Sequence, residues 1–83
     1  MGVSVKQADT KIIAWNAYFI ARLDDFPVSL GHCEIFPRQH IESLFELDSE
    51  QILSLDTLLR DAKLVLDSQF QPDGYNIGIN EGE

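Results

Sequence analysis

Two short runs in the first half of the chain carry the side chains best suited to chemistry. Asp24 and Asp25 lie in a turn with Pro27 and Gly31, and His32 begins the next apolar run. These turn formers act differently: a carboxylate bonds its own backbone, proline fixes φ, and glycine adopts conformations barred to other residues. The pattern predicts a hairpin that holds carboxylates beside a histidine on a rigid frame, a common way to build a site. The alternative is a hairpin whose tip is merely polar.

A second candidate lies near the C-terminus, where apolar and polar side chains alternate over residues 75–80. The alternation predicts a strand whose apolar face packs on a helix. Its other face would carry Asn76, Gly78 and Asn80, and glycine in a strand marks a place where a ligand or another backbone comes close. We therefore expect this face to form the floor of a small-ligand site. The alternative is an edge strand whose second face is exposed to water.

Residue types alone give no complete catalytic apparatus. Adjacent strand residues point to opposite faces, so His32 and Cys33 are poorly placed to share a zinc ion or to form a nucleophile pair. The sequence contains no Walker phosphate loop, no Gly-x-Gly-x-x-Gly and no Gly-x-Ser-x-Gly elbow. We expect no metal and no cofactor.

Composition limits the partner classes. The chain has 83 residues, enough for one small domain, and its net charge of −8 argues against a general binder of nucleic acid. A small phosphorylated ligand is still compatible, because a few backbone N–H groups can hold one. Cys33 is the only cysteine, which favours a reducing compartment. With no signal-peptide core and no apolar run near ~20 residues, we expect a cytoplasmic protein without a membrane partner.

Three short strands are predicted before the helix. They cover residues 11–14, 18–23 and 32–36, and the polar segment 1–10 is expected to be a flexible N-terminus. Both faces of the second run are apolar, which predicts a central strand covered on both sides. Arg22 is the exception and is expected to reach toward solvent or an acid.

The clearest element is a helix over residues 49–70. Asp48 occupies the N-cap position with Gln51 three residues later, a variant of the capping box, and Pro72 cannot continue the helix. Apolar residues recur at spacings of three and four, which indicates one buried face. The residues of this predicted stripe are Ile52, Leu55, Leu59, Ala62 and Leu66.

Leu53 and Leu64 fall outside this stripe. Isolated surface leucines are normal, but on a small domain they can also mark a second apolar face. A chain of this length buries only about 60–65% of its unfolded surface, so a partner would help to stabilise it. We predict a homodimer, with the face that carries Leu53 as its candidate surface, and an α+β fold with an antiparallel sheet of about four strands.

The order and spacing of these pieces resemble the histidine triad (HIT) family of nucleotide-binding hydrolases and transferases. The matching runs are residues 23–32, which contain Pro-x-x-x-Gly-His, residues 36–41, which contain Pro-Arg-x-His, and residues 73–82, which contain Gly-Tyr-Asn-x-Gly-x-Asn. The resemblance implies a HIT-like antiparallel sheet backed by one long helix over residues 11–83. It also implies a homodimer, and an incomplete domain that lacks the last strand or strands.

The resemblance implies roles for individual residues. Asp24 would contact the ribose of a purine nucleotide or dinucleotide, with Leu23 and Asp25 beside the base and sugar. His32 would lie behind the catalytic histidines in a supporting hydrogen-bond network, and Asn80 would lie near the phosphate. The predicted nucleotide-binding residues are Leu23, Asp24, Asp25, Asn76 and Asn80.

Departures from the family bear on activity. The family is named for His-x-His-x-His, whose middle histidine attacks the α-phosphate, whereas this sequence has only His32 and His40, outside any such motif. Glu34 stands where an aliphatic residue is usual, and Asp25 where a hydrophobic one is common. We expect no catalytic residue in this chain and no hydrolysis of nucleotides by the chain as given.

Two functional classes follow. The first is a HIT-type hydrolase of nucleoside phosphoramidates or dinucleoside polyphosphates, or a nucleotidyl transferase, represented here by its N-terminal part. The second is a non-catalytic remnant that keeps the fold and binds a nucleotide or another protein chain. Residues beyond Glu83 in the native product would separate the two classes.

Overall fold

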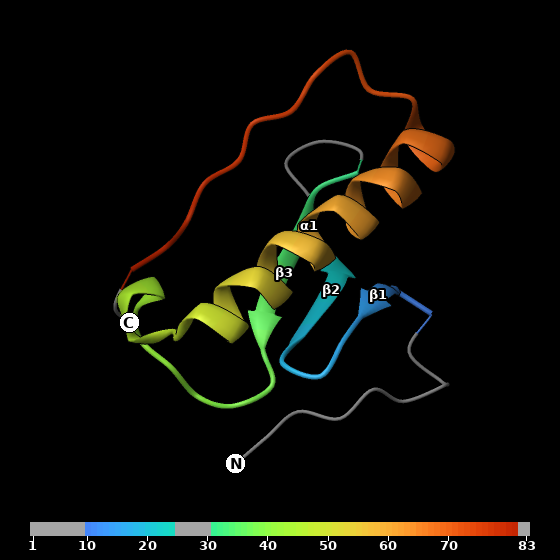
Figure 1. Ribbon diagram of the computed structural model, residues 1–83. Coiled ribbons are helices and arrows are strands. Elements are labelled where there is room, and N and C mark those ends of the chain that lie inside the picture. Colours follow the sequence, from blue (N-terminus) through green and yellow to red (C-terminus); the bar gives the residue numbers. More distant parts are fainter. Residues whose placement is uncertain (1–9, 25–30, 82–83) are drawn as a thin grey trace.

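The computed structural model describes residues 10–24 and 31–81, in which a small sheet is covered on one face by a long helix (Figure 1). The predicted α+β fold is confirmed, with three strands in the described part of the chain instead of about four. In chain order the elements are β1 (Ile12–Trp15), β2 (Phe19–Leu23), β3 (Cys33–Pro37), the 3-10 helix η1 (Leu44–Glu46) and α1 (Ser49–Phe70).

The sheet is an antiparallel meander in the order β1-β2-β3. As predicted, β2 is central: Phe19, Ile20 and Ala21 are at most 3% exposed. Phe19 and Ala21 pack in the cluster that contains the helix residues, so Ile20 between them points to the opposite face. Pro37 ends β3, where a residue without an N–H is tolerated because the strand has a partner on one side only in the described structure.

A β-bulge changes the register of β1. Ile12 pairs with Arg22, whereas Trp15 pairs with Ile20, and the register shifts directly after Ile12. One extra residue in β1 therefore lies between these two pairs. As a result, Ile12 and Trp15 lie on the same face of the sheet, the one turned away from α1.

The bounds of α1 agree with the prediction, and so does its N-terminal capping box. The Asp48 carboxylate accepts from the Gln51 N–H at 2.8 Å, and the Gln51 side chain accepts from the Asp48 N–H at 3.0 Å. At the other end Gln71 adopts a left-handed conformation, with φ of 51°, before Pro72. Within the described residues, no helix is long and apolar enough to cross a membrane.

Of the predicted stripe of α1, Ala62 and Leu66 are buried, and Leu55 and Leu59 are half-buried. Leu58, which was not predicted, is fully buried, whereas Ile52, which was predicted to be buried, is 41% exposed. The helix packs on β1 and β2 through the side that carries Leu58, and this leaves Ile52 on an exposed flank. Leu53 and Leu64 lie outside the stripe as predicted and are 66% and 69% exposed.

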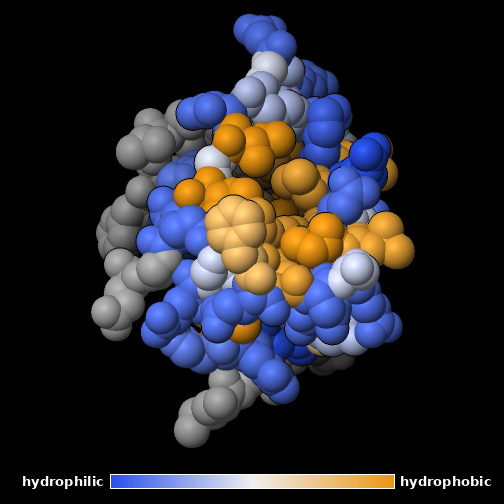
Figure 2. Space-filling view, turned by 60° about the vertical axis from the view of Figure 1, so that its left-hand side comes forward, coloured by the Kyte–Doolittle hydropathy of each residue, from blue (hydrophilic) through white to orange (hydrophobic). Residues whose placement is uncertain are grey.

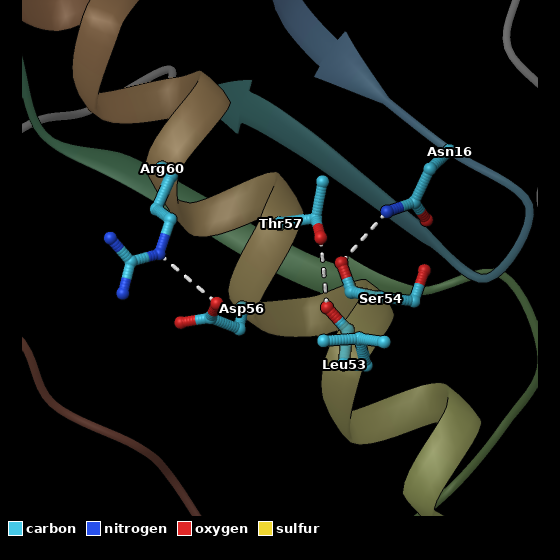
Figure 3. Close-up of polar contacts among 6 residues, drawn as sticks. All are labelled: Asn16, Leu53, Ser54, Asp56, Thr57 and Arg60. Atoms are coloured by element: carbon cyan, nitrogen blue, oxygen red, sulfur yellow. Dashed lines mark hydrogen bonds and ion pairs between the residues drawn. The ribbon is translucent and has the colours of Figure 1, made fainter.

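Asn16, in the turn between β1 and β2, joins the sheet to the helix (Figure 3). Its side-chain Nδ2 donates to the Ser54 carbonyl at 2.8 Å, and its Oδ1 accepts from the N–H groups of Tyr18 and Phe19 at 3.0 Å. Its backbone carbonyl accepts from Arg38 Nε at 2.7 Å, which also ties in the chain after β3. One asparagine therefore fixes the turn, the position of α1 and the exit from β3.

The predicted fourth strand over residues 75–80 is wrong for this structure. Residues 71–81, here called the C-terminal strap, run as an extended segment with no strand among them (Figure 1). Ile77 and Ile79 are 65% and 61% exposed, so their predicted packing on the helix is also wrong, whereas Tyr75, 41% exposed, does contact α1. In Figure 2 the left-hand side of Figure 1 comes forward, and apolar side chains gather in the middle of that face with hydrophilic ones around them.

The strap is held at its two ends by side chains instead of by strand pairing. Near its start, the Tyr75 hydroxyl donates to Asp67, and Lys63 Nζ lies 5.4 Å from the centre of the tyrosine ring. At its end, the Glu81 carboxylate accepts from Ser43 Oγ at 2.6 Å and from the Leu44 N–H at 2.9 Å, at the N-terminus of η1.

These anchors shift the ionisation of the groups involved. Hydrogen bonds from Lys63 and Tyr75 lower the pKa of Asp67. Desolvation, followed by the bond to Asp67, raises the pKa of Tyr75 to about 12. The hydrogen bond from Ser43, followed by that from the Leu44 backbone, lowers the pKa of Glu81 below its ordinary value of 4.5.

We predict that replacing Asn16 destabilises the fold more than breaking a surface ion pair. Asn16→Ala removes three side-chain hydrogen bonds and should lower the free energy of unfolding by roughly 1–3 kcal/mol. The matched control is Arg60→Ala, which breaks the exposed pair with Asp56 at 3.0 Å and should cost less than about 1 kcal/mol. Urea unfolding measures both, and equal losses would contradict the proposed role of Asn16.

We predict that the Glu81 anchor is lost in acid. Because the folded-state pKa of Glu81 is lowered, its contribution is complete above the ordinary value of 4.5 and disappears as the pH falls through the lowered pKa. Hydrogen exchange at the Leu44 amide should therefore accelerate in that acid range. Glu81→Gln removes the titrating group and should flatten this dependence, and an unchanged pH profile in the variant would contradict the assignment.

Candidate functional site

The site is built where β2 ends and β3 begins. Asp24 directly follows β2 and His32 directly precedes β3, and the Asp24 N–H donates to the His32 carbonyl at 2.9 Å. This bond continues the register that pairs Leu23 with Cys33, so the two side chains lie on the same face of the sheet. His32 Nδ1 lies 3.3 Å from Asp24 Oδ2. A carboxylate and an imidazole are thus held together by strand pairing.

The pair is partly shielded from water. The side chains of Asp24 and His32 are 21% and 39% exposed, and the Nδ1 atom itself is buried. Nδ1 approaches the carboxylate at an ion-pair distance but without the alignment of a hydrogen bond. A carboxylate offers about four acceptor positions on its two oxygens, so the contact with His32 alone does not exhaust the acceptor capacity of Asp24.

The other predicted site residues lie in three places. Leu23 is half-buried at the end of β2, and Asp25 lies outside the described residues. Asn76 and Asn80 are exposed on the strap, which is anchored through Glu81 beside η1, beyond the far end of β3 (Figure 1). The structure therefore brings Asp24 and His32 together, and it places Asn80 next to the Glu81 anchor, beyond the other end of β3.

Cys33 and His40 take no part in this site. Cys33 is a half-buried free cysteine, and burial raises the pKa of its thiol, which opposes formation of a reactive thiolate. The His40 side chain is 79% exposed, and its Nε2 lies 3.7 Å from Glu42 Oε1 at the surface. In residues 10–24 and 31–81, no three His, Cys, Asp or Glu side chains gather as ligands for a metal ion.

Two charged residues beside the pair were not predicted as site residues. Arg22 and Glu34 are directly opposite each other on β2 and β3, two residues along each strand from Asp24 and His32 and on the same face. The period-two spacing of residues 22 and 24, and of 32 and 34, is the sequence signal that could have found them. The pairing register that brings them together is not visible in the sequence.

Three similar proteins each match most of the sequence. An uncharacterized 16.1 kDa HIT-like protein of Mycoplasma pneumoniae is 34% identical over 67 residues, which are 81% of this chain and 46% of the relative. HIT-like proteins of Mycoplasma genitalium and Saccharolobus solfataricus are 33% and 32% identical, over 84% and 87% of this chain and 50% and 52% of their own lengths. The chain thus spans about half the length of the curated relatives that it matches.

The family comparison covers nearly the whole sequence. The family model described as HIT domain matches residues 5–83, a range that contains the sheet, α1 and the Asp24–His32 pair. The chain therefore belongs to the HIT domain family.

Proposed function

We propose that this chain binds a purine nucleotide or dinucleotide at the Asp24–His32 pair, and that it represents a HIT-type nucleotide phosphohydrolase or nucleotidyl transferase. The observation that carries the proposal is the 3.3 Å approach of His32 Nδ1 to Asp24 Oδ2, where β2 ends and β3 begins. Membership of the HIT domain family supports the nucleotide as ligand. The single free cysteine fits a reducing, cytoplasmic location.

The chemistry of the pair suits a ribose. Two neighbouring hydroxyl groups can both donate to one carboxylate, and each such charge-assisted hydrogen bond contributes about 1.5–3 kcal/mol. Because strand pairing fixes Asp24 at the backbone, little order has to be created when the ligand binds. In this proposal His32 is a positioning residue that orients the carboxylate.

A non-catalytic binding module is the second candidate. Attack on an α-phosphate needs a neutral imidazole positioned in line, together with donors that stabilise the developing charge. The sequence contains two histidines; His32 turns a buried Nδ1 toward Asp24, and His40 is exposed after the end of β3. These positions favour binding over nucleophilic attack by the residues of this chain.

We also propose that the working species is a homodimer. Leu53 and Leu64 are 66% and 69% exposed and lie about three helical turns apart, on the same side of α1. That side faces away from the sheet, so contact there would leave the Asp24–His32 pair open.

We predict that Asp24→Ala weakens the binding of adenosine monophosphate by tenfold or more. Loss of one charge-assisted hydrogen bond already corresponds to about one decade in affinity, since 1.4 kcal/mol is a factor of ten. Isothermal titration calorimetry measures the change. The control is Asp61→Asn on the exposed surface of α1, which removes a charge far from the pair and should leave the affinity unchanged. Unchanged affinity in a folded Asp24→Ala chain would remove Asp24 from the site.

We predict that Leu53→Glu weakens self-association without unfolding α1. A charge in an apolar contact is costly to desolvate, whereas glutamate is a good helix former. Sedimentation velocity at several concentrations measures association, and circular dichroism checks the helix. Gln39→Glu adds the same charge at an exposed position outside α1 and serves as the control. Equal behaviour of the two variants would show that this face of α1 is not the contact.

A further inference from the structure

Strand β1 contributes two apolar side chains to the sheet face that carries Asp24 and His32. The register pairs Ile12 and Trp15 with residues of β2 whose side chains alternate with the core residues and face away from α1. Ile12 and Trp15, here called the β1 strip, therefore lie on the face turned away from the helix. Among the described residues β1 is an edge strand, so the strip has another strand on one side only.

The spacing of the strip from Asp24 suits a nucleoside. Asp24 lies two positions beyond the β2 partner of Ile12 and four positions beyond the partner of Trp15. At about 3.3 Å per residue, these separations along the sheet are about 6.6 Å and about 13 Å. A base is joined directly to its ribose, so a base whose ribose lies at Asp24 reaches Ile12, and Trp15 is the next side chain along the strip.

Trp15 is the member of the strip with an open surface. It is 56% exposed, whereas its cross-strand partner Ile20 is 0% exposed and Ile12 is half-buried. The indole is a large, rigid apolar surface, and covering it with another flat ring is favourable. Because Ile20 leaves no room beside it on β2, a ligand on this part of the face lies against the indole.

We propose that the indole of Trp15 stacks on the base of the nucleotide whose ribose lies at Asp24, and that Ile12 supports the edge of the same base. The inference rests on the proposed function, from which it takes the position of the ribose. Stacking on an aromatic side chain is tolerant of base identity, because every base has a π face. The β1 strip therefore accepts adenine and guanine alike.

The chemistry of the strip favours a base over a phosphate group as its occupant. Phosphate oxygens are held by cations and by N–H donors, whereas the strip presents an aliphatic side chain and the face of an indole. A base needs no hydrogen bonds on its two faces, and at the edge of the sheet its polar rim can stay in water.

A tryptophan with a purely structural role would behave differently. It would support β1 by packing beside Ile20 whether or not a nucleotide is bound, and its fluorescence would not respond to the ligand. Trp15 is the only tryptophan of the chain, so the fluorescence reports on this position alone.

The test titrates adenosine monophosphate into the full 83-residue chain and follows tryptophan fluorescence and calorimetry in parallel. We expect quenching that saturates with the dissociation constant found by calorimetry. Trp15→Leu should weaken binding about fivefold or more, and Trp15→Phe should restore most of the loss. Phe45→Leu removes another exposed aromatic side chain, in η1, and should leave the affinity unchanged. Circular dichroism and urea midpoints check that each variant is folded.

The outcomes separate this inference from the proposed function. Binding that depends on Asp24 but keeps its affinity in a folded Trp15→Leu chain would overturn the assignment of Trp15 alone. A loss that Trp15→Phe does not restore would do the same, because an aromatic face would then not be what the base requires. Failure of the unmodified chain to bind adenosine monophosphate would overturn the proposed function and this inference together.

Discussion

The side chain of Asn16 is the interaction on which the arrangement of the layers depends. It bonds the turn between β1 and β2 to the Ser54 carbonyl of α1, and its own backbone carbonyl receives Arg38 from the chain after β3. Both polar atoms of the amide are bonded, so the group stabilises a specific geometry without leaving an unpaired donor or acceptor. The connection fixes the first turns of α1 beside the β1–β2 turn, and Leu58, one turn further along, packs in the core with Phe19 and Ala21.

Strand β2 serves two purposes through simple alternation. Phe19 and Ala21 face the helix and form part of the core. Ile20 and Arg22 alternate with them and face away from the helix, on the same side of the sheet as Asp24. The functional end of the sheet is therefore positioned by the same burial that stabilises the fold. Backbone bonding between Asp24 and His32 extends the pairing beyond the last residues of the two strands, which explains how the carboxylate and the imidazole meet.

Local signals predicted local structure, and contacts that depend on distant partners were missed. The capping box of Asp48 and Gln51 and the stop at Pro72 located α1, and three strands were predicted to within one residue of their observed ends. Alternation over residues 75–80 indicated only that the segment is amphipathic, because a strand also needs an edge to pair with. Leu58 was missed because the buried side of a helix depends on which strands lie beneath it. In the same way, turn chemistry predicted that Asp24 and His32 would be neighbours, whereas the pairing of Arg22 with Glu34 required the register.

The anchoring of the C-terminal strap has a consequence for the order in which the molecule folds and opens. The contact between Ser43 and Glu81 spans 38 positions, and closing a flexible loop of that length costs about 3 kcal/mol in chain entropy. Once α1 has formed on the sheet, most of that span is rigid, and only the strap remains to be ordered. The exposed anchors should therefore close last and open first, as a separate cooperative unit of low local stability. The hairpin that holds Asp24 and His32, secured by its own backbone pairing, would stay intact through such an opening.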